Sequence, residues 1–323
     1  DNAAMIAAAA WPRLARGEYV PCFGLTELTA GSDAVSIRAE GEVIRGDDGA
    51  PRIRLNFAKR YITLAPVANL ISLAYRLRDP QELLGAGTDP GITVALIHRD
   101  APGLTIGDHH RPIGDGFYNG PLSGENVMLE PDAIIGGAAG AGQGWRMLME
   151  QLAGGRAVSL PAGSVGSMKY LAGVTGAYSM VRSQFGIDIG HMEGVQAKVA
   201  RIAGLAYLFE AARVYTCSAL DHDQQPPVIS ALLKMATSDY ARRLAVDAMD
   251  VFAGAGVMQG PNNLVGRAYT NAPVSVTVEG ANIMTRTLIV FGQGATRCHP
   301  HALELVNAVE ADDVDGFRTH LLG

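Results

Sequence analysis

Hydrophobic residues form short runs separated by turns over residues 18–135, and recur at helical spacing over residues 145–309. Short β-prone runs between turns that contain Gly, Pro or Asp-Gly are typical of an antiparallel sandwich or barrel. The pattern predicts strands at 34–39, 42–44, 53–57, 61–64, 70–76, 92–97, 104–106 and 126–129. We therefore expect the first part of the chain to form an antiparallel β domain.

The second part of the chain has the apolar spacing of helices. Apolar residues repeat at the helical period over 145–174, 194–221, 226–252 and 285–291, and many are small enough for close packing in a bundle. The glycine-rich stretch 136–144 resembles a phosphate loop in its glycine spacing. It lacks a following Lys-Ser/Thr, so a loop before a helix is favoured. The predicted fold class is α+β, with a middle antiparallel β-barrel or sandwich domain (18–135) before a C-terminal helical bundle domain (136–309).

Composition narrows the class of protein. The 323 residues are 48% hydrophobic and 18% charged, as in a globular chain with a large core. A net charge of −6 without a basic tract argues against nucleic acid as a partner. The three cysteines, at 22, 217 and 298, are too far apart for a disulfide framework, which fits a reducing compartment. We expect a cytoplasmic protein, with any membrane association arising from segments absent from this chain.

Glu279 is the acidic residue of a largely apolar stretch, 273–291. Apolar neighbours desolvate a carboxylate and raise its pKa toward the range of a general base. The alternative is a carboxylate in the first turn of a helix, which the helix dipole favours. Spacing alone favours this more ordinary alternative.

Two further segments could bind a ligand. Residues 22–33 combine small residues, hydroxyls and two acids, which suits a polar planar ligand or a phosphate, or equally a plain strand, turn and strand. Residues 182–186 place an Arg, an amide and an aromatic around a Gly, which could hold a phosphate, although an interhelix loop is more ordinary. A metal site at His109, His110, Cys298, His299 and His301 is not favoured, because their spacing lacks a ligand pattern.

Six segments, in this order along the chain, resemble motifs of the acyl-CoA dehydrogenase family. They are 23–33 (aromatic-x-x-Thr-Glu…Ala-Gly-Ser-Asp), 61–63, 152–156, 182–186 with Val195-Gln196, 251–256 and 279–286. The wording of 291–300 looks most like the long, multidomain members of bacterial fatty-acid β-oxidation. This resemblance implies that 1–17 ends an N-terminal helical domain, that the bundle has four helices, and that 310–323 is a tail or connects to a further domain.

The resemblance also implies an activity. Members bind FAD between barrel and bundle, oxidise an acyl-CoA thioester to the trans-2-enoyl-CoA and pass electrons to an electron-transfer flavoprotein. Glu279 matches the base that removes the α-proton, while the β-hydrogen leaves as hydride to flavin N5. Long-chain substrates follow from the subgroup it resembles, and a homodimer or larger assembly from motif residues that reach a neighbouring subunit's FAD.

The matching positions imply the site residues. FAD contacts fall on Phe23, Leu25, Thr26, Gly31, Ser32, Tyr61, Ile62, Thr63, Arg182, Gln184, Phe185 and Gly254. Substrate contacts fall on Ser32, Gly280 and Arg156, the last near the CoA end of the acyl pocket. The sequence departs from the family pattern at Ala153, Asp250, Ala253, Ala281 and Asn282. Two alternatives stay open: an acyl-CoA oxidase on the same scaffold, and a non-catalytic interaction fragment.

Overall fold

The computed structural model describes residues 12–114, 117–224, 227–295 and 299–322. The chain divides into two compact units, Asp1–Glu150 and Gln151–Gly323. Residues 12–15 are helical, while residues 1–11 of the predicted first segment lie outside the described residues. The predicted domain boundaries at 17/18, 135/136 and 309/310 stay predictions.

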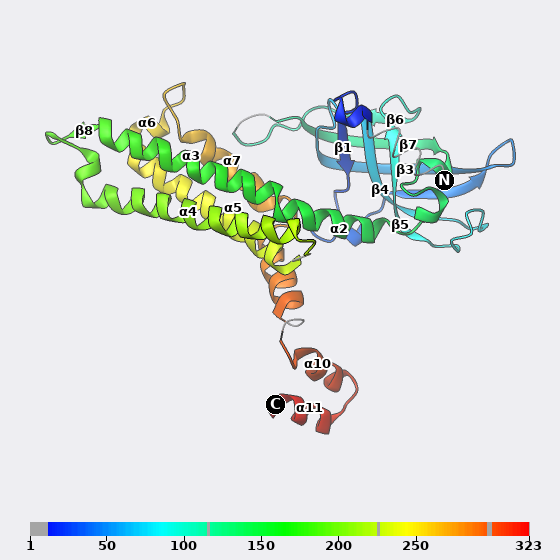
Figure 1. Ribbon diagram of the computed structural model, residues 1–323. Helices are drawn as coiled ribbons and strands as arrows, with labels where there is room; N and C mark the ends of the chain where they lie inside the picture. The colour runs from blue at the N-terminus through cyan, green and yellow to red at the C-terminus, as the bar shows by residue number, and fades with distance from the viewer. Residues whose placement is uncertain (1–11, 115–116, 225–226, 296–298, 323) are drawn as a thin grey trace. The chain divides into compact units, whose positions relative to one another are not determined.

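Seven strands of the first unit form one curled sheet (Figure 1). The strands are β1 (Pro21–Gly24), β2 (Glu40–Arg45), β3 (Pro51–Thr63), β4 (Leu70–Arg78), β5 (Gly91–His98), β6 (Leu104–Ile106) and β7 (Asn119–Leu129). Their order is β1-β4-β2-β3-β7-β6, with β5 also paired to β4. Four pairings are antiparallel, as predicted, but β4 pairs in parallel with both β1 and β2, so the sheet is mixed.

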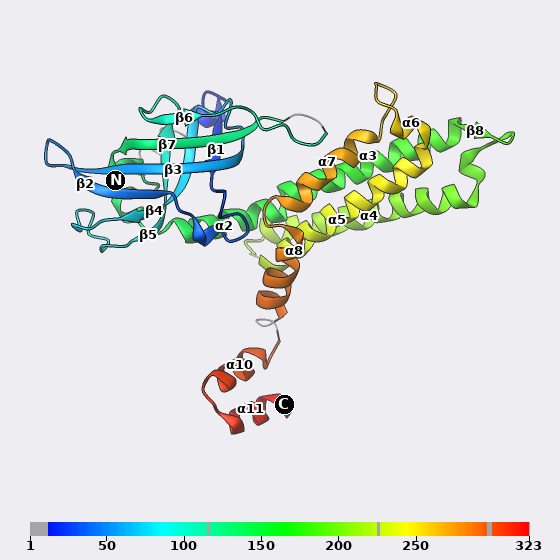
Figure 2. The same cartoon turned by 180° about the vertical axis from the view of Figure 1, so that it is seen from behind.

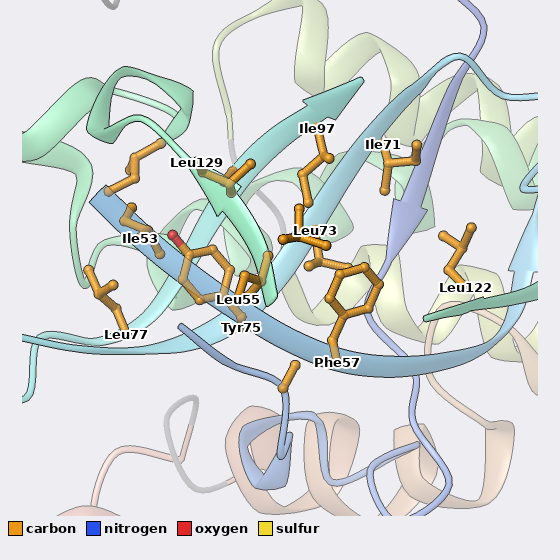
Figure 3. Packing of buried hydrophobic residues seen from close by; sticks show 14 of the residues in the cluster. Ile53, Leu55, Phe57, Ile71, Leu73, Tyr75, Leu77, Ile97, Leu122 and Leu129 are labelled. Carbon is orange, nitrogen blue, oxygen red and sulfur yellow. The ribbon is translucent and has the colours of Figure 1, made fainter. Parts of the chain in front are cut away.

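Alternation along the strands builds the core of this unit. In β3, Ile53, Leu55 and Phe57 are buried while the residues between them are not, because successive side chains of a strand point to opposite faces. Figure 3 shows these side chains packed against Leu73 and Tyr75 of β4. The strand was predicted as two runs, 53–57 and 61–64. It is one strand with register irregularities between Leu55 and Phe57 and between Lys59 and Ile62.

The predicted strand at 34–39 is wrong. Residues Ala34–Ser36 form the 3-10 helix η1, and the Ser36 hydroxyl donates to the Asp33 carboxylate. The backbone N–H groups of Arg38 and Ala39, at the end of the predicted strand, donate to the Glu27 carboxylate at 2.6 and 3.0 Å. A buried side chain thus takes the donors that a strand ladder would use.

Four helices of the second unit pack around one core: α3 (Ser159–Val181), α4 (Glu193–Asp221), α5 (Pro227–Phe252) and α7 (Gly266–Thr277). Figure 1 shows α3, α4 and α5 running alongside one another, and Figure 2 shows α7 leading into α8 (Asn282–Met284). The bundle matches the predicted helices at 194–221 and 226–252 to within a residue. Helix α7 was not predicted as a separate element, since it contains Pro273.

The predicted helix at 145–174 is two helices, α2 (Gly144–Ala157) and α3, separated at Val158. Pro161 lies in the first turn of α3, where its missing N–H costs no helical hydrogen bond. In a continuous helix it would have broken the bond to Ala157, so the chain restarts instead. The 3-10 helix η2 (Pro131–Ala133) precedes the predicted loop 136–144, which itself contains the 3-10 helix η3 (Gly137–Gly140).

Shorter elements complete the second unit. They are β8 (Ser183–Gln184), β9 (Ile187–Asp188), η4 (Ile189–His191), α6 (Gly254–Val257), the π-helix η5 (Thr285–Ala295), α10 (Ala302–Glu310) and α11 (Val314–Leu322). The predicted helix at 285–291 falls within η5. Across the described ranges, no helix has the length and apolar character to cross a membrane.

A buried ion pair fixes the segment after β1. The Lys59 ammonium lies 2.6 Å from the Glu27 carboxylate, with 0% and 6% of the two side chains exposed. It also donates to the Leu25 carbonyl at 3.1 Å. Burial lowers the pKa of Lys59, and the hydrogen bond to Glu27 opposes that shift. The pair ties the 25–39 segment to β3.

Truncating Glu27 to Ala is expected to destabilise the protein by about 3–5 kcal/mol, because it leaves the Lys59 ammonium buried without its partner. Truncating Glu42 is the matched control. Its pair with Arg54 is 41% and 43% exposed, and its loss is expected to cost less than about 1 kcal/mol. Urea unfolding of the full chain measures both. Equal losses of stability from the two substitutions would show that the buried pair stabilises the protein no more than the exposed pair does.

Candidate functional site

Glu279 lies in a tight turn between α7 and α8. Its φ is 54° and that of Gly280 is 91°, so both residues are left-handed. This conformation is uncommon for a residue with a Cβ. Helix α8 begins only at Asn282, so Glu279 is not a first-turn carboxylate, and the more ordinary interpretation is wrong.

Two cationic side chains hold the main chain of this turn. Arg156 Nε donates to the Glu279 carbonyl at 2.9 Å, and Lys234 Nζ donates to the Gly280 carbonyl at 2.8 Å. The Thr285 hydroxyl donates to the same Gly280 carbonyl at 3.2 Å. Hydrogen bonds to consecutive carbonyls from α2, α5 and η5 fix the turn and so fix where the Glu279 side chain starts.

The Glu279 carboxylate itself is left with a free oxygen. The side chain is half-buried, and Oε2 is fully shielded without a hydrogen-bond partner in the described part of the chain. Burial raises the pKa of Glu279, and the positive charges of Arg156 and Lys234 oppose that rise. A shielded carboxylate oxygen that binds nothing within the protein is able to accept a proton from a ligand.

Sequence reasoning missed Lys234. This side chain is fully buried on α5, and burial lowers its pKa to about 8. Its ammonium also donates to Asn282 Oδ1 at 2.8 Å, while Asn282 Nδ2 donates to Ser238 Oγ at 2.9 Å and to the Met235 carbonyl at 3.2 Å. One signal existed, because Lys234 lies at the helical spacing of the buried Ala241 and Ala245.

Arg156 was expected near the CoA end of the acyl pocket. The structure places its Nε on the carbonyl of Glu279, 123 residues further along the chain. Gly280, expected to contact substrate, contributes its carbonyl to Lys234 and Thr285. Glu279, Gly280 and Arg156 thus form one cluster within the second unit.

The remaining candidates of the second unit lie elsewhere in it. Gln184 and Phe185 lie in the exposed hairpin of β8 and β9, and Arg182 ends α3 just before it. Phe185 is left-handed, with 95% of its surface exposed. Gly254 opens α6, with no atom within 4 Å of where a Cβ would lie. Asp250, a departure from the family pattern, pairs with Lys198 at 2.7 Å.

Candidates on the segment after β1 offer hydroxyls and main-chain groups. Phe23 is 37% exposed on β1. Leu25 and Thr26 are half-buried, and their carbonyls accept from Lys59 Nζ and from the Arg60 N–H at 3.1 and 2.9 Å. Gly31 and Ser32 are exposed, and a Cβ on Gly31 would meet nothing within 4 Å.

The β3 candidates lie around the second irregularity of that strand. Tyr61 is left-handed and 55% exposed, and its ring stands edge-on to His110 with 5.1 Å between centroids. Thr63 Oγ1 accepts from Asn119 Nδ2 at 3.4 Å, and Asn119 Oδ1 lies 2.8 Å from His110 Nδ1. Ile62 is buried in the sheet core, so its side chain is not available to a ligand.

The metal interpretation finds no support in the described residues, where no group of three His, Cys, Asp or Glu side chains could hold an ion. Cys298 lies outside those residues. His110 instead belongs to the hydrogen-bonded pair with Asn119.

Two family models cover most of the chain. Residues 22–127 match the acyl-CoA dehydrogenase middle domain, and residues 142–292 match the acyl-CoA dehydrogenase C-terminal domain. The folds agree as well. The structure of butyryl-CoA dehydrogenase from Megasphaera elsdenii superposes with a TM-score of 0.75 at 27% identity, over 88% of this chain and 70% of that one.

Two relatives extend the match. Cyclohex-1-ene-1-carbonyl-CoA dehydrogenase of Geobacter metallireducens is 30% identical over 81% of this chain and 65% of its own length. The probable acyl-CoA dehydrogenase FadE25 of Mycobacterium tuberculosis is 31% identical over 86% of this chain and 68% of its own. The chain spans as little as 61% of the length of the curated relatives it matches. Sequence, domain order and fold agree: the chain belongs to the acyl-CoA dehydrogenase family.

Proposed function

We propose that this chain is the catalytic part of an FAD-dependent acyl-CoA dehydrogenase, which converts an acyl-CoA thioester into the trans-2-enoyl-CoA. The observation that carries the proposal is the Glu279 carboxylate, whose shielded Oε2 has no partner in the described residues. The α-hydrogen of a thioester is weakly acidic, and its removal needs a base with a raised proton affinity. Burial supplies that by raising the pKa of Glu279.

The surfaces of the first unit fit a flavin. Exposed Ser32 and the open space at Gly31 offer room for a phosphate-bearing group, and the exposed Tyr61 ring offers a planar surface. With Leu25, Thr26 and Thr63, these residues would hold FAD. When bound, FAD supplies the acceptor for the hydride that leaves the β-carbon.

The protein's own residues handle the proton and the developing charge. Glu279 takes the α-proton, and Arg156 and Lys234 keep its turn in place through their carbonyl hydrogen bonds. By family resemblance, the Glu279 backbone N–H polarises the thioester carbonyl as enolate character develops. Fixed donors of this kind need no rearrangement during the reaction.

Partners and substrate length are finer parts of the same proposal. The long-chain preference and a role in fatty-acid β-oxidation rest on the resemblance of 291–300, and the electron-transfer flavoprotein on the family's chemistry. The assembly of two or more chains rests on the resemblance of 182–186 to a motif that reaches a neighbouring subunit's FAD, and Phe185 of that segment is 95% exposed. The cytoplasm is proposed as the location.

Glu279→Gln is expected to slow anaerobic bleaching of the flavin by palmitoyl-CoA by roughly 10²–10⁴-fold, because the amide cannot accept the α-proton. FAD binding is expected to persist, since the turn is held through main-chain carbonyls. Glu304→Gln, on the exposed face of α10, is the matched control. Stopped-flow absorbance of the flavin measures the rates. A near-normal rate for Glu279→Gln would remove this residue as the base.

The bleaching rate is expected to fall as pH is lowered, because only ionised Glu279 accepts a proton. Since burial raises the pKa of Glu279, the acid limb is expected above the ordinary value of 4.5. The raised pKa of Glu279 also lowers the stability of the folded protein. Above this pKa the buried charge disfavours the folded state, so Glu279→Gln is expected to unfold at a higher temperature at neutral pH. An acid limb that persists in the residual activity of Glu279→Gln would assign it to another group.

The electron acceptor separates a dehydrogenase from an oxidase. After anaerobic reduction by palmitoyl-CoA, the flavin is expected to reoxidise slowly in air and rapidly with an electron-transfer flavoprotein. Absorbance after mixing gives both rates. Rapid reoxidation in air would favour the acyl-CoA oxidase, and a purified chain that takes up no FAD would favour an interaction fragment.

A further inference from the structure

Lys234 is buried and makes specific hydrogen bonds, neither of which a helix of the bundle requires at this position. None of its side chain is exposed, and its Nζ binds two acceptors that follow Glu279: the Gly280 carbonyl and Asn282 Oδ1, each at 2.8 Å. Burying an ammonium is costly unless it meets such partners. An apolar residue at this position would avoid that cost, but it would leave the Gly280 carbonyl only the Thr285 hydroxyl and Asn282 Oδ1 only the Ser238 hydroxyl among the donors described.

We propose that Lys234 is a positioning residue for Glu279. Lys234 holds the turn that follows Glu279 by hydrogen bonds and places a fixed positive charge beside the Glu279 carboxylate. The inference rests on the proposed role of Glu279 and adds a second residue to that role. Lys234 acts through the turn and through its charge, without contact to the substrate.

The geometry separates this role from that of a base. Lys234 directs its N–H groups at two acceptors, and Ser238 Oγ adds a donor at 3.4 Å to the same Asn282 oxygen. Glu279 Oε2, in contrast, has no partner in the described part of the chain. The group that is free to take a proton is therefore the carboxylate.

The charge of Lys234 has an effect that a neutral hydrogen-bond donor would lack. Burial raises the pKa of Glu279, and only Arg156 and Lys234 oppose that rise among the described charges that act on it. Asp239 is the acid of α5 that is nearest to Lys234 in sequence. Its carboxylate lies 3.7 Å or less from Arg242, Arg243 and Arg286 and is therefore already paired with other cations. Without Lys234, Arg156 alone would keep Glu279 ionised.

The pKa of about 8 for Lys234 is consistent with this role, because the side chain is then mostly charged at neutral pH. Arg156 lowers the pKa of Lys234, and Glu279 raises it. The charges of Arg156 and Glu279 therefore act on the pKa of Lys234, and the two cations and one anion lie around main-chain carbonyls.

The test is a titration of the Glu279 carboxyl by infrared difference spectroscopy on the FAD-loaded protein. The C=O stretch of the protonated carboxyl is assigned by its loss in Glu279→Gln. In Lys234→Met the midpoint is expected to move up by about one pH unit, because a nearby cation is lost. Lys234→Arg, which keeps the charge, is expected to restore most of the shift. Lys169→Met, which removes a 58% exposed lysine of α3 paired with Glu210, is the matched control and is expected to leave the midpoint unchanged.

Flavin reduction by palmitoyl-CoA gives the second readout. Lys234→Met is expected to slow it by roughly 10- to 100-fold, as for a displaced reacting group, and to move its acid limb upward with the carboxyl midpoint. Should Lys234→Met fail to fold, Lys234→Gln makes the same test with one amide donor left for Gly280. A midpoint in either variant equal to that of Lys169→Met would overturn the proposal. Absence of flavin reduction in the unaltered protein would instead overturn the proposed function, and the carboxyl titration would still decide the role of Lys234.

Discussion

The second unit depends on hydrogen bonds from Arg156 and Lys234 to the two carbonyls at Glu279 and Gly280. A left-handed residue with a Cβ costs about 1–3 kcal/mol and persists only where its surroundings impose it. Here Arg156 and Lys234 stabilise it, because each donates a hydrogen bond to a carbonyl of the turn. The same bonds occupy the cations with main-chain oxygens and leave Glu279 Oε2 without a partner in the described residues. The hydrogen bonds from Arg156 and Lys234 therefore fix the turn and leave the Glu279 carboxylate available to a ligand.

The two units use a buried acid in opposite ways. Glu27 accepts from the Lys59 ammonium and from two backbone N–H groups, at 2.6–3.0 Å, so every strong donor near it is engaged in holding the 25–39 segment. Glu279 has cations nearby as well, but they bind the backbone. The two carboxylates therefore differ in their hydrogen-bond partners, a difference that burial alone does not reveal.

Local signals in the sequence predicted most of the fold. Apolar spacing placed the ends of α4 and α5 to within a residue, and the β-prone run at 53–57 lies within β3. The failures have both local and distant causes: Pro161 divides the helix expected at 145–174, whereas a carboxylate outside the segment replaces the strand expected at 34–39. The Glu27 carboxylate binds the backbone N–H groups of Arg38 and Ala39, and the contact between Arg156 and a carbonyl 123 residues away has no local signal in the sequence. The helical spacing of Lys234 indicates a buried position, but nothing local in the sequence indicates its acceptors at Gly280 and Asn282.

Asn282 explains why the turn is held from the bundle. The sequence departs from the family pattern at this position. It is 8% exposed, and its amide binds Ser238 and Met235 while its oxygen accepts from Lys234. All three partners lie on α5, so the turn is fixed to the surface of a long helix rather than to other loops. A reactive group mounted on a rigid element is held more accurately than one on a loop. Asn282 therefore reaches α5 with both ends of its amide and fixes the turn that carries Glu279, the proposed base.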